Sequence, residues 1–360
     1  MNSKVKIESN EIILTTSEFI NAINITCGLY KPLNGFCKFK NYKSIIRKKK
    51  TNFEKNWTIP ILLNLKNKKN YMLGSRYYLF YKKKKVGFIN AESIFKIDKR
   101  KYCKSVFNTN SLNHPSVKEI YTNSNSFIGG KIKIFEKYLI KDKYFAYNYF
   151  KKNKFYFSNS VVFSTRNICH LGHQLIHEKV IKMKKNLTVC IIQSEKNKFD
   201  PKLIINSYKH LRKKKKLYKE IKIIKIFLPS LMAGPNEAYM QAAYFDNLNF
   251  NSFIIGRDHA GYKNYFNKYE SQNIFKKLNR LRIKITKTRE PLMCHKCLSV
   301  FFENKKNCKC IIKKLPHTIN GNLIKKYLLT NKKKVVKKFL DPEIYEFCMK
   351  NLAVIKKFKG

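Results

Sequence analysis

Hydrophobic and polar positions follow one pattern up to about residue 140 and another from about residue 155. In the first part, short apolar or alternating runs predict strands, and turn residues such as PLNG at 32–35 separate them. The predicted strands are EIILT, TIPILLNL, YYLFY and KIKIF, with Gly129 and Gly130 directly before the last of them. We therefore expect a mainly β domain with a few helices in this part of the chain.

From about residue 155, short β-branched apolar runs alternate with helix-like segments. The predicted buried strands are SVVFST (160–165), LTVCIIQS (187–194), IKIIKIFLP (221–229) and FIIG (253–256). The helix-like stretches are HLGHQLIHEKVIKM (170–183) and AYMQAAYF (238–245). This alternation predicts an α/β fold with a parallel sheet. The chain after residue 290 holds a cysteine cluster and ends in lysine-rich, helix-like segments.

The length of the chain bears on the number of domains, and its charge bears on the kind of partner it binds. The chain has 360 residues, more than one hydrophobic core usually serves, so two or three domains are expected. A formal net charge of +55 taken alone favours a polyanion partner such as nucleic acid. However, Lys, Asn, Ile, Phe and Tyr all have codons rich in A and T, and the basic runs are spread along the whole chain. We interpret the charge as genome composition and expect only nonspecific, low-salt attraction to nucleic acid, with no specific nucleic-acid partner.

Targeting signals and cysteines point to a reducing compartment. No run approaches the ~20 apolar residues that a membrane span needs, and MNSKVKIESNE lacks the apolar stretch of a secretory signal. Of the ten cysteines, four gather in CHKC and CKC and the rest are scattered, which is not a disulfide framework. We therefore expect a cytoplasmic protein without a membrane partner.

The cysteine cluster is typical of a metal site. Zinc takes four ligands around a tetrahedron, and two such knuckles supply four thiolates. The predicted structural zinc ligands are Cys294, Cys297, Cys308 and Cys310. His295 and His317 are also possible fourth ligands.

The stretch STRNICHLGH (164–173) joins a predicted strand to a predicted helix. Free N–H groups and the helix dipole attract anions to a helix N-terminus. His170 and His173 are three residues apart, so they lie on one helical face and can donate hydrogen bonds to phosphate oxygens. Gly172 lets a backbone or ring come close. This HxGH pattern is the signature of nucleotidyltransferases that transfer an adenylyl group.

Two further loops follow predicted strands. IIGRDHAG (254–261) offers a cation, a carboxylate and an imidazole in succession, between two glycines that permit tight backbone. MAGPNEA (232–238) follows the strand before it. Parallel sheets of this type bind ligands at the carboxyl ends of their strands. The three loops together therefore predict one shared site.

These motifs resemble those of the sulfate adenylyltransferase, or ATP sulfurylase, family. That family carries QTRNPxHxxH, AGPREA and GRDHAG, which here are STRNICHLGH, AGPNEA and an unchanged GRDHAG. GLYKPLNGF (28–36) is similar to the family's GAFSPLxGF, SLNHPSV (111–117) to its DxxHPGV, and IGG (128–130) to its GG turn. The resemblance covers nearly the whole chain, and its order and spacing are specific.

The resemblance implies an architecture and a reaction. The domains it implies are a PUA-like β-rich domain (1–145), a central Rossmann-like HxGH catalytic domain (146–290) and a small zinc-containing C-terminal domain (291–360). The family converts ATP and sulfate into adenosine 5′-phosphosulfate and pyrophosphate with Mg²⁺. The forward reaction serves sulfate assimilation, and the reverse reaction makes ATP during sulfur oxidation. Members of the family commonly form homo-oligomers such as dimers. Sulfate is already an anion, so its attack on the α-phosphorus needs no general base.

The resemblance also implies a role for each motif residue. The implied catalytic residues are Thr165, Arg166, Asn167, His170 and His173. The implied ATP-binding residues are Arg166, Asn167, His170, His173, Gly256, Arg257, Asp258 and His259. The implied sulfate-binding positions are Ser164, Arg166 and Ala260, whose backbone N–H would contact sulfate. An arginine suits the sulfate contact because its planar fork can bind two oxygens at once.

Three departures from the family pattern bear on whether the activity is retained. Ser164 replaces a glutamine, Ile168 a proline and Asn236 an arginine, so one sulfate contact is shortened and one cation is missing. Weaker sulfate affinity is the mild consequence, and a degenerate enzyme is the severe one. Two further functions stay open: an HxGH transferase that adenylylates a different acceptor, and a basic nucleic-acid-binding protein built on a PUA-like module.

Overall fold

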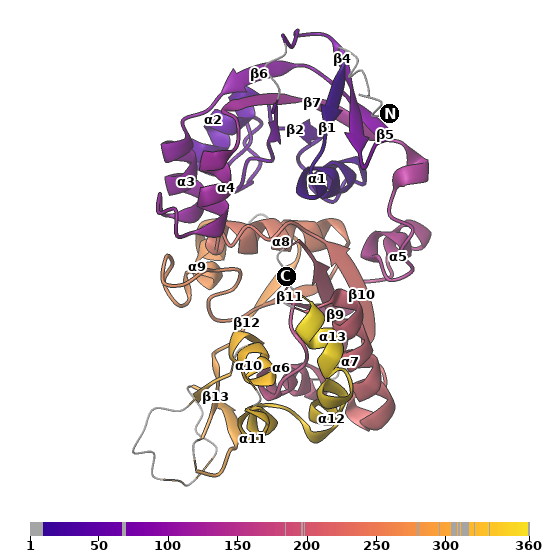
Figure 1. Ribbon diagram of the computed structural model, residues 1–360, viewed down its shortest axis with the longest axis vertical. Coiled ribbons are helices and arrows are strands. Elements are labelled where there is room, and N and C mark those ends of the chain that lie inside the picture. The colour runs from indigo at the N-terminus through magenta and orange to yellow at the C-terminus, as the bar shows by residue number, and fades with distance from the viewer. Residues whose placement is uncertain are drawn as a thin grey trace, which may run out of the picture. The chain divides into compact units, whose positions relative to one another are not determined.

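The computed structural model describes most of the chain and divides it into two compact units (Figure 1). The described residues are 10–66, 70–183, 185–195, 197, 199–278, 281–294, 296–303, 308, 310, 317–319, 321–330 and 332–358. The first unit comprises Met1–Asp142, Leu228–Leu248 and Asp258–Arg282, and the second comprises Lys143–Phe227, Asn249–Arg257 and Ile283–Gly360. The predicted domain limits at residues 145 and 290 stay predictions.

The first unit is built on a mostly antiparallel sheet around one long strand, β7. Its strands are β1 (Glu11–Ile13), β2 (Gly35–Phe36), β3 (Leu63–Asn64), β4 (Arg76–Tyr81), β5 (Lys84–Asn90), β6 (Ser93–Lys96) and β7 (Ser126–Ile134). Strand β7 pairs with β2, β3, β5 and β6, and β1 runs parallel to β4. The predicted β-rich sheet is confirmed, but this part of the chain is mixed α/β and not mainly β, because helices occupy about as many of its residues as strands do.

Helices complete the first unit. They are α1 (Thr16–Thr26), α2 (Phe39–Lys48), α3 (Lys99–Phe107), α4 (Pro115–Thr122), α8 (Pro235–Asn247) and α9 (Glu270–Lys277). The capping box of Thr15 and Glu18 starts α1, and Pro115 and Pro235 occupy the first turns of α4 and α8, where no N–H partner is needed. Helices α2, α3 and α4 pack side by side (Figure 1).

Two local predictions in this unit are wrong. Gly129 and Gly130 lie inside β7 and not before a strand. A β-carbon on Gly129 would lie 2.3 Å from the carbonyl oxygen of Cys37, so the strand needs glycine because neighbouring backbone approaches closely. TIPILLNL forms only the two-residue strand β3, because Pro60 has no N–H to pair with a neighbouring strand.

The second unit holds the predicted parallel sheet. Its strands are β8 (Ser160–Thr165), β9 (Asn186–Gln193), β10 (Lys222–Phe227), β11 (Ser252–Ile255) and β12 (Lys284–Lys287), in the order β10-β9-β8-β11-β12. Every pair is parallel. The chain runs outward from β8 in one direction and then returns to add β11 on its other side. The strand order therefore reverses between β8 and β11, the point where such sheets bind ligands.

Helices and a small second sheet surround this parallel sheet. The helices are α5 (Ala146–Lys152), α6 (Leu171–Lys182), α7 (Pro201–Lys214), α10 (Gly321–Leu329), α11 (Lys333–Val336), α12 (Pro342–Lys350) and α13 (Leu352–Lys357). Strands β13 (Pro291–Met293), β14 (Val300–Phe302) and β15 (His317–Thr318) form the antiparallel sheet. Helix α12 lies beside α7 (Figure 1), where His210 Nε2 contacts Glu343 Oε2 at 3.0 Å. The C-terminal residues Ile324, Phe339 and Ile344 join the core that β8 and β9 build.

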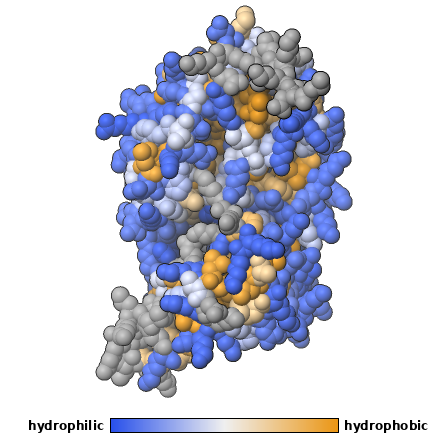
Figure 2. Space-filling model, viewed as in Figure 1, coloured by the Kyte–Doolittle hydropathy of each residue, from blue (hydrophilic) through white to orange (hydrophobic). Residues whose placement is uncertain are grey.

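The surface carries the lysines. Hydrophilic side chains cover most of the visible face, and hydrophobic ones show as separate patches (Figure 2). Lys82–Lys85 are exposed at the β4–β5 hairpin, and Lys213 and Lys214 are exposed at the end of α7. These runs lie in different units. None of the helices in the described ranges is both long and apolar enough to cross a membrane.

Candidate functional site

The turn after β8 places His170 at the start of α6. Thr165 Oγ1 accepts the backbone N–H of Asn167 at 3.0 Å, which closes the turn. His170 is the N-cap residue, and its Nδ1 accepts the backbone N–H of His173 at 3.3 Å. The two imidazole rings lie 3.7 Å apart between centroids. A β-carbon on Gly172 would lie 3.2 Å from His170 Nδ1, so glycine lets the ring lie close against the helix, as predicted.

Burial favours the neutral form of the two histidines of this turn, His170 and His173. Burial lowers the pKa of His170 to about 3 and, together with the two neighbouring histidines, lowers the pKa of His173 well below its usual range. Because His170 Nδ1 accepts a hydrogen bond, the proton of its neutral ring lies on Nε2. The turn therefore presents an imidazole N–H donor and not a fixed positive charge.

A third histidine, His177, supports the pair from one turn further along α6. Its Nδ1 lies 3.2 Å from the hydroxyl of Tyr218, and the ring of Phe163 makes edge contacts with both His173 and His177. Burial lowers the pKa of His177 to about 3. The sequence alone assigns His177 no role, because its partner Tyr218 lies far along the chain.

The remaining residues of STRNICHLGH divide between the core and the strand end. Ile168 is 1% exposed and belongs to the hydrophobic core, so the family proline is replaced by an apolar anchor. Arg166 is half-buried at the carboxyl end of β8. Ser164 Oγ is buried and has no hydrogen-bond partner among the described residues. A buried hydroxyl without a partner is costly unless water or a ligand completes it.

Gly256 and Arg257 follow β11, the strand next to β8. Both strands are parallel, so the turn after β8 and the start of GRDHAG share the edge where the strand order reverses. Arg257 Nε lies 3.1 Å from Oε1 of Glu290, a side chain that is 8% exposed. Sequence reasoning missed Glu290, because no local pattern links it to Arg257. The pair fixes the direction of the arginine side chain.

The rest of GRDHAG belongs to the first unit, where it meets AGPNEA. The backbone N–H of Gly234 donates to the carbonyl of Ala260 at 3.0 Å. Asp258 and Ala260 adopt positive φ angles of 48° and 58°, a conformation that non-glycine residues keep only where surrounding contacts enforce it. A β-carbon on Gly261 would lie 1.9 Å from Asp258 Oδ1, which explains the closing glycine.

Asn236, the third departure, has a structural partner in the same unit. Its Nδ2 donates to the carbonyls of Val106 at 2.9 Å and Ser105 at 3.2 Å, at the end of α3. Its own carbonyl accepts the hydroxyl of Thr58 at 2.6 Å. The last carbonyls of a helix lack partners within the helix. Asn236 therefore ties α8 to α3.

The four predicted metal ligands lie together. The sulfur atoms of Cys294, Cys297, Cys308 and Cys310 are all within 4.8 Å of one another. Zinc–sulfur bonds of about 2.3 Å place tetrahedral thiolates about 3.8 Å apart, so the cluster fits zinc after a small contraction. Hydrogen bonds from the hydroxyl and backbone N–H of Ser299 lower the pKa of the Cys297 thiol to about 6, which favours the thiolate that binds metal.

His295 and His317 stay predicted as possible fourth ligands. His295 lies outside the described residues. The backbone of His317 is part of β15.

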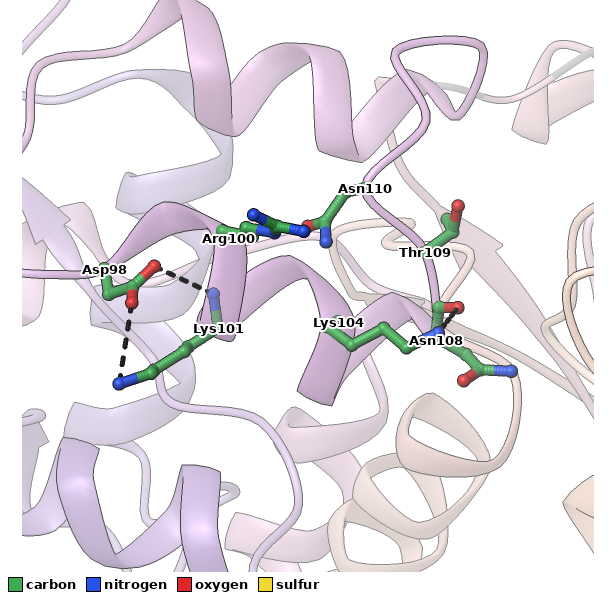
Figure 3. A pocket seen from close by; sticks show the side chains of 7 residues that line it. All are labelled: Asp98, Arg100, Lys101, Lys104, Asn108, Thr109 and Asn110. Carbon is green, nitrogen blue, oxygen red and sulfur yellow. Dashed lines mark hydrogen bonds and ion pairs between the residues drawn. The ribbon is translucent and has the colours of Figure 1, made fainter.

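An open pocket of about 670 Å³ lies in the first unit on α3 and the turn after it (Figure 3). Its lining residues are Asp98, Arg100, Lys101, Lys104, Asn108, Thr109 and Asn110. Among them, Lys101 pairs with Asp98 at 3.8 Å (Figure 3). The residues that line this pocket include none of the predicted nucleotide or sulfate contacts.

The structure thus groups the predicted residues in two sets. Thr165–Asn167, His170, His173, Gly256 and Arg257 gather along one sheet edge of the second unit. Asp258, His259 and Ala260 pack with AGPNEA in the first unit. Their roles in binding ATP and sulfate remain predictions.

Two segments of the chain match models of known protein families. Residues 2–137 match the family model of the PUA-like domain, and residues 148–351 match that of ATP-sulfurylase. The chain belongs to the ATP-sulfurylase family. The predicted combination of a PUA-like domain with a nucleotide-binding α/β domain is confirmed, and the chain is of the nucleotidyltransferase class of enzyme.

Relatives of this ATP-sulfurylase family member are similar over most of their length. Sulfate adenylyltransferase from Ignicoccus hospitalis is 29% identical over 327 residues, which are 86% of this chain and 82% of that protein. Sulfate adenylyltransferase from Pyrococcus abyssi is 28% identical over 342 residues, covering 91% of this chain and 86% of that protein.

A solved structure shares the fold. The hexameric APS kinase from Thiobacillus denitrificans superposes with a TM-score of 0.69 at 11% identity. The match covers 95% of this chain, which spans 63% of that structure's length.

Proposed function

We propose that this member of the ATP-sulfurylase family is a sulfate adenylyltransferase, which converts ATP and sulfate into adenosine 5′-phosphosulfate and pyrophosphate. One observation carries the proposal. The HxGH turn is intact, with His170 capping α6 and its ring close against that of His173, at the sheet edge where the strand order reverses. A helix N-terminus with imidazole donors at that edge suits a bound polyphosphate.

The reaction depends on aligning sulfate with the α-phosphorus of ATP more than on acid–base catalysis. A sulfate oxygen attacks the α-phosphorus in line, the bond to the β,γ-diphosphate breaks, and pyrophosphate leaves with the electron pair. No proton has to be removed from sulfate. His170 Nε2–H and the neighbouring His173 can then stabilise negative charge as it grows toward pyrophosphate. Neutral donors of this kind bind phosphate without repelling the Mg²⁺ that accompanies ATP.

The roles proposed for the other residues follow from their chemistry. Arg166 is the proposed sulfate and ATP contact, with Thr165 and Asn167 holding the turn in which it lies. Gly256, Arg257, Asp258 and His259 are the proposed contacts to the nucleotide, and the Ala260 N–H the proposed contact to sulfate. The Arg257–Glu290 pair keeps the arginine oriented while leaving its guanidinium partly exposed.

The proposed cofactors are Mg²⁺ with ATP and one structural Zn²⁺. Cys294, Cys297, Cys308 and Cys310 would hold the zinc as a closed four-thiolate site, which stabilises the fold and takes no part in the reaction. We also propose a cytoplasmic homo-oligomer that serves sulfate assimilation. None of the ten cysteines, all of which the structure describes, is in a disulfide, which suits a reducing compartment.

The direct test measures pyrophosphate release from ATP by the purified protein, with and without sulfate. Sulfate-dependent release is expected. Arg166→Ala should reduce it at least ~10²-fold, because the arginine would contact sulfate in the transition state. Arg212→Ala, which removes an exposed arginine from α7, is the matched control and should retain it. Release that does not depend on sulfate, or normal turnover of Arg166→Ala, would contradict the proposal.

A further inference from the structure

Three polar side chains form a hydrogen-bonded chain within the first unit. Glu237 Oε2 accepts the backbone N–H groups of Leu231 and Ala233, each at 3.2 Å. Glu237 Oε1 accepts the side-chain amide of Gln241 at 3.1 Å. Gln241 Oε1 in turn lies 2.9 Å from Nε2 of His259. Glu237 and Gln241 are each 2% exposed, so water does not compete for these bonds.

The donors and acceptors of this chain allow one arrangement. The Glu237 carboxylate, which receives three N–H groups, can only accept, so the NH₂ group of Gln241 must face it. The amide oxygen of Gln241 then faces His259. An amide oxygen can also only accept, so His259 Nε2 must carry a proton. In the neutral ring, this places the lone pair on Nδ1.

The backbone of His259 is held by other groups. Ser271 Oγ donates to its carbonyl at 2.8 Å, and Gly234 N–H donates to the next carbonyl, that of Ala260, at 3.0 Å. Gln241 therefore acts on the orientation and proton position of the ring and is not needed to hold the loop. Glu237 and Gln241 are four residues apart on α8, so one helical face carries both.

We propose that Gln241 is a positioning residue that holds the neutral His259 ring as the Nε2–H tautomer, with Glu237 orienting the Gln241 amide. This inference rests on the proposed function, in which His259 contacts the nucleotide. In this tautomer Nδ1 is an acceptor, and a ring that is already held in place spares the cost of ordering it when ATP binds.

The test reads the tautomer directly. ¹⁵N-histidine NMR of the full chain reports which ring nitrogen carries the proton, and the His259→Asn spectrum assigns the His259 signals. The wild type should show the Nε2–H tautomer. Gln241→Met keeps the length of the side chain but removes both hydrogen bonds, so His259 should shift to a mixture of tautomers. Gln241→Asn, which is too short to bridge both partners, should do the same if the Met variant does not fold.

Asn64→Leu is the matched control. It removes a buried amide from β3, where Asn64 Nδ2 donates to the carbonyl of Ser124 at 2.7 Å, and it should leave the His259 signals unchanged. In activity assays, Gln241→Met should raise the Michaelis constant for ATP about tenfold and leave that for sulfate unchanged.

The outcomes separate the two proposals. His259 signals that stay in one tautomer in both Gln241 variants would overturn the positioning role, whatever the activity. A tautomer change without any change in the Michaelis constant for ATP would also overturn it, because the ring position would not matter for binding. A wild-type protein that lacks sulfate-dependent pyrophosphate release would instead refute the proposed function, and the tautomer experiment would still decide whether Gln241 orders His259.

Discussion

Gly321, the first residue of α10, lies directly against the side chain of Asn167 in the turn after β8. A β-carbon built on Gly321 would lie 2.2 Å from Asn167 Oδ1 and 2.3 Å from its Cγ, far inside van der Waals contact. The asparagine amide can therefore keep its position only while residue 321 is glycine. This contact links the C-terminal helices to the turn that carries the predicted catalytic residues.

The variant Gly321→Ala should separate activity from stability. The new methyl group forces Asn167 to rotate, so sulfate-dependent turnover should fall about tenfold or more if Asn167 acts as proposed. Alanine favours a helix over glycine by up to ~1 kcal/mol, which offsets part of the strain, so the free energy of unfolding should change little. Steady-state kinetics and urea unfolding measure the two effects. Unchanged turnover would show that the position of Asn167 does not matter.

Local patterns predicted the second unit well. Strands β8, β9, β10 and β11 match the four apolar runs, because buried parallel strands read as continuous β-branched segments. The HxGH turn was also readable, since His170, Gly172 and His173 make their contacts within four residues. Strand β12 was missed, because KITK at 284–287 is short and its exposed ends are lysines.

Contacts between distant segments were not readable. The sequence shows that Asn236 replaces an arginine, but only the fold shows that its amide caps α3, 130 residues away. Likewise, Arg257 forms an ion pair with Glu290, which is 33 residues further along the chain. Residue 129 must be glycine because the backbone of Cys37 packs directly against it. Each of these depends on which segments the fold brings together, and one sequence carries no local signal for that.

The buried histidines predict an acid-sensitive fold. Burial depresses the folded-state pKa of His170 and His177 to about 3, while the unfolded chain titrates near 6.5. Above pH 6.5 both states are neutral, and stability is unaffected by these groups. As the pH falls from 6.5 toward 3, the unfolded state binds protons that the folded state excludes. The free energy of unfolding should fall by up to about 1.4 kcal/mol per pH unit for each histidine.

Urea unfolding between pH 7.5 and 5 measures this slope. His177→Phe removes one titrating ring but keeps an aromatic side chain between Phe163 and Tyr218, so its slope should be smaller than that of the wild type. Equal slopes for the two proteins would show that His177 already titrates normally in the folded state.

Metal analysis tests the cysteine cluster. Protein purified under reducing, chelator-free conditions should contain about one zinc per chain. Cys294→Ser should lose the zinc and destabilise the surrounding β13–β15 sheet before it affects turnover, because the site is structural. Cys27→Ser removes a cysteine outside the cluster and should retain the metal. A wild-type protein without zinc would refute the prediction.

Ser164 offers the most specific test of the proposed sulfate site. The family has glutamine there, and serine lacks two carbons and an amide, so its hydroxyl should not reach the same sulfate oxygen. The buried Oγ has no partner among the residues that the structure describes, so its hydrogen bond would have to be completed by water or ligand. Restoring the long side chain should therefore add one hydrogen bond to a charged group, worth ~1.5–3 kcal/mol at most.

Ser164→Gln should then lower the Michaelis constant for sulfate by up to about 10²-fold and leave that for ATP nearly unchanged. Ser164→Ala is the matched control. It removes the hydroxyl without adding a longer side chain, so it should not lower the Michaelis constant for sulfate. If Ser164→Gln instead abolishes turnover while the protein stays folded, the pocket has been rebuilt around serine. The buried Ile168, which replaces the family proline in the same turn, would be the first residue to revert with it. The family's sulfate contact would then not apply to this chain at position 164.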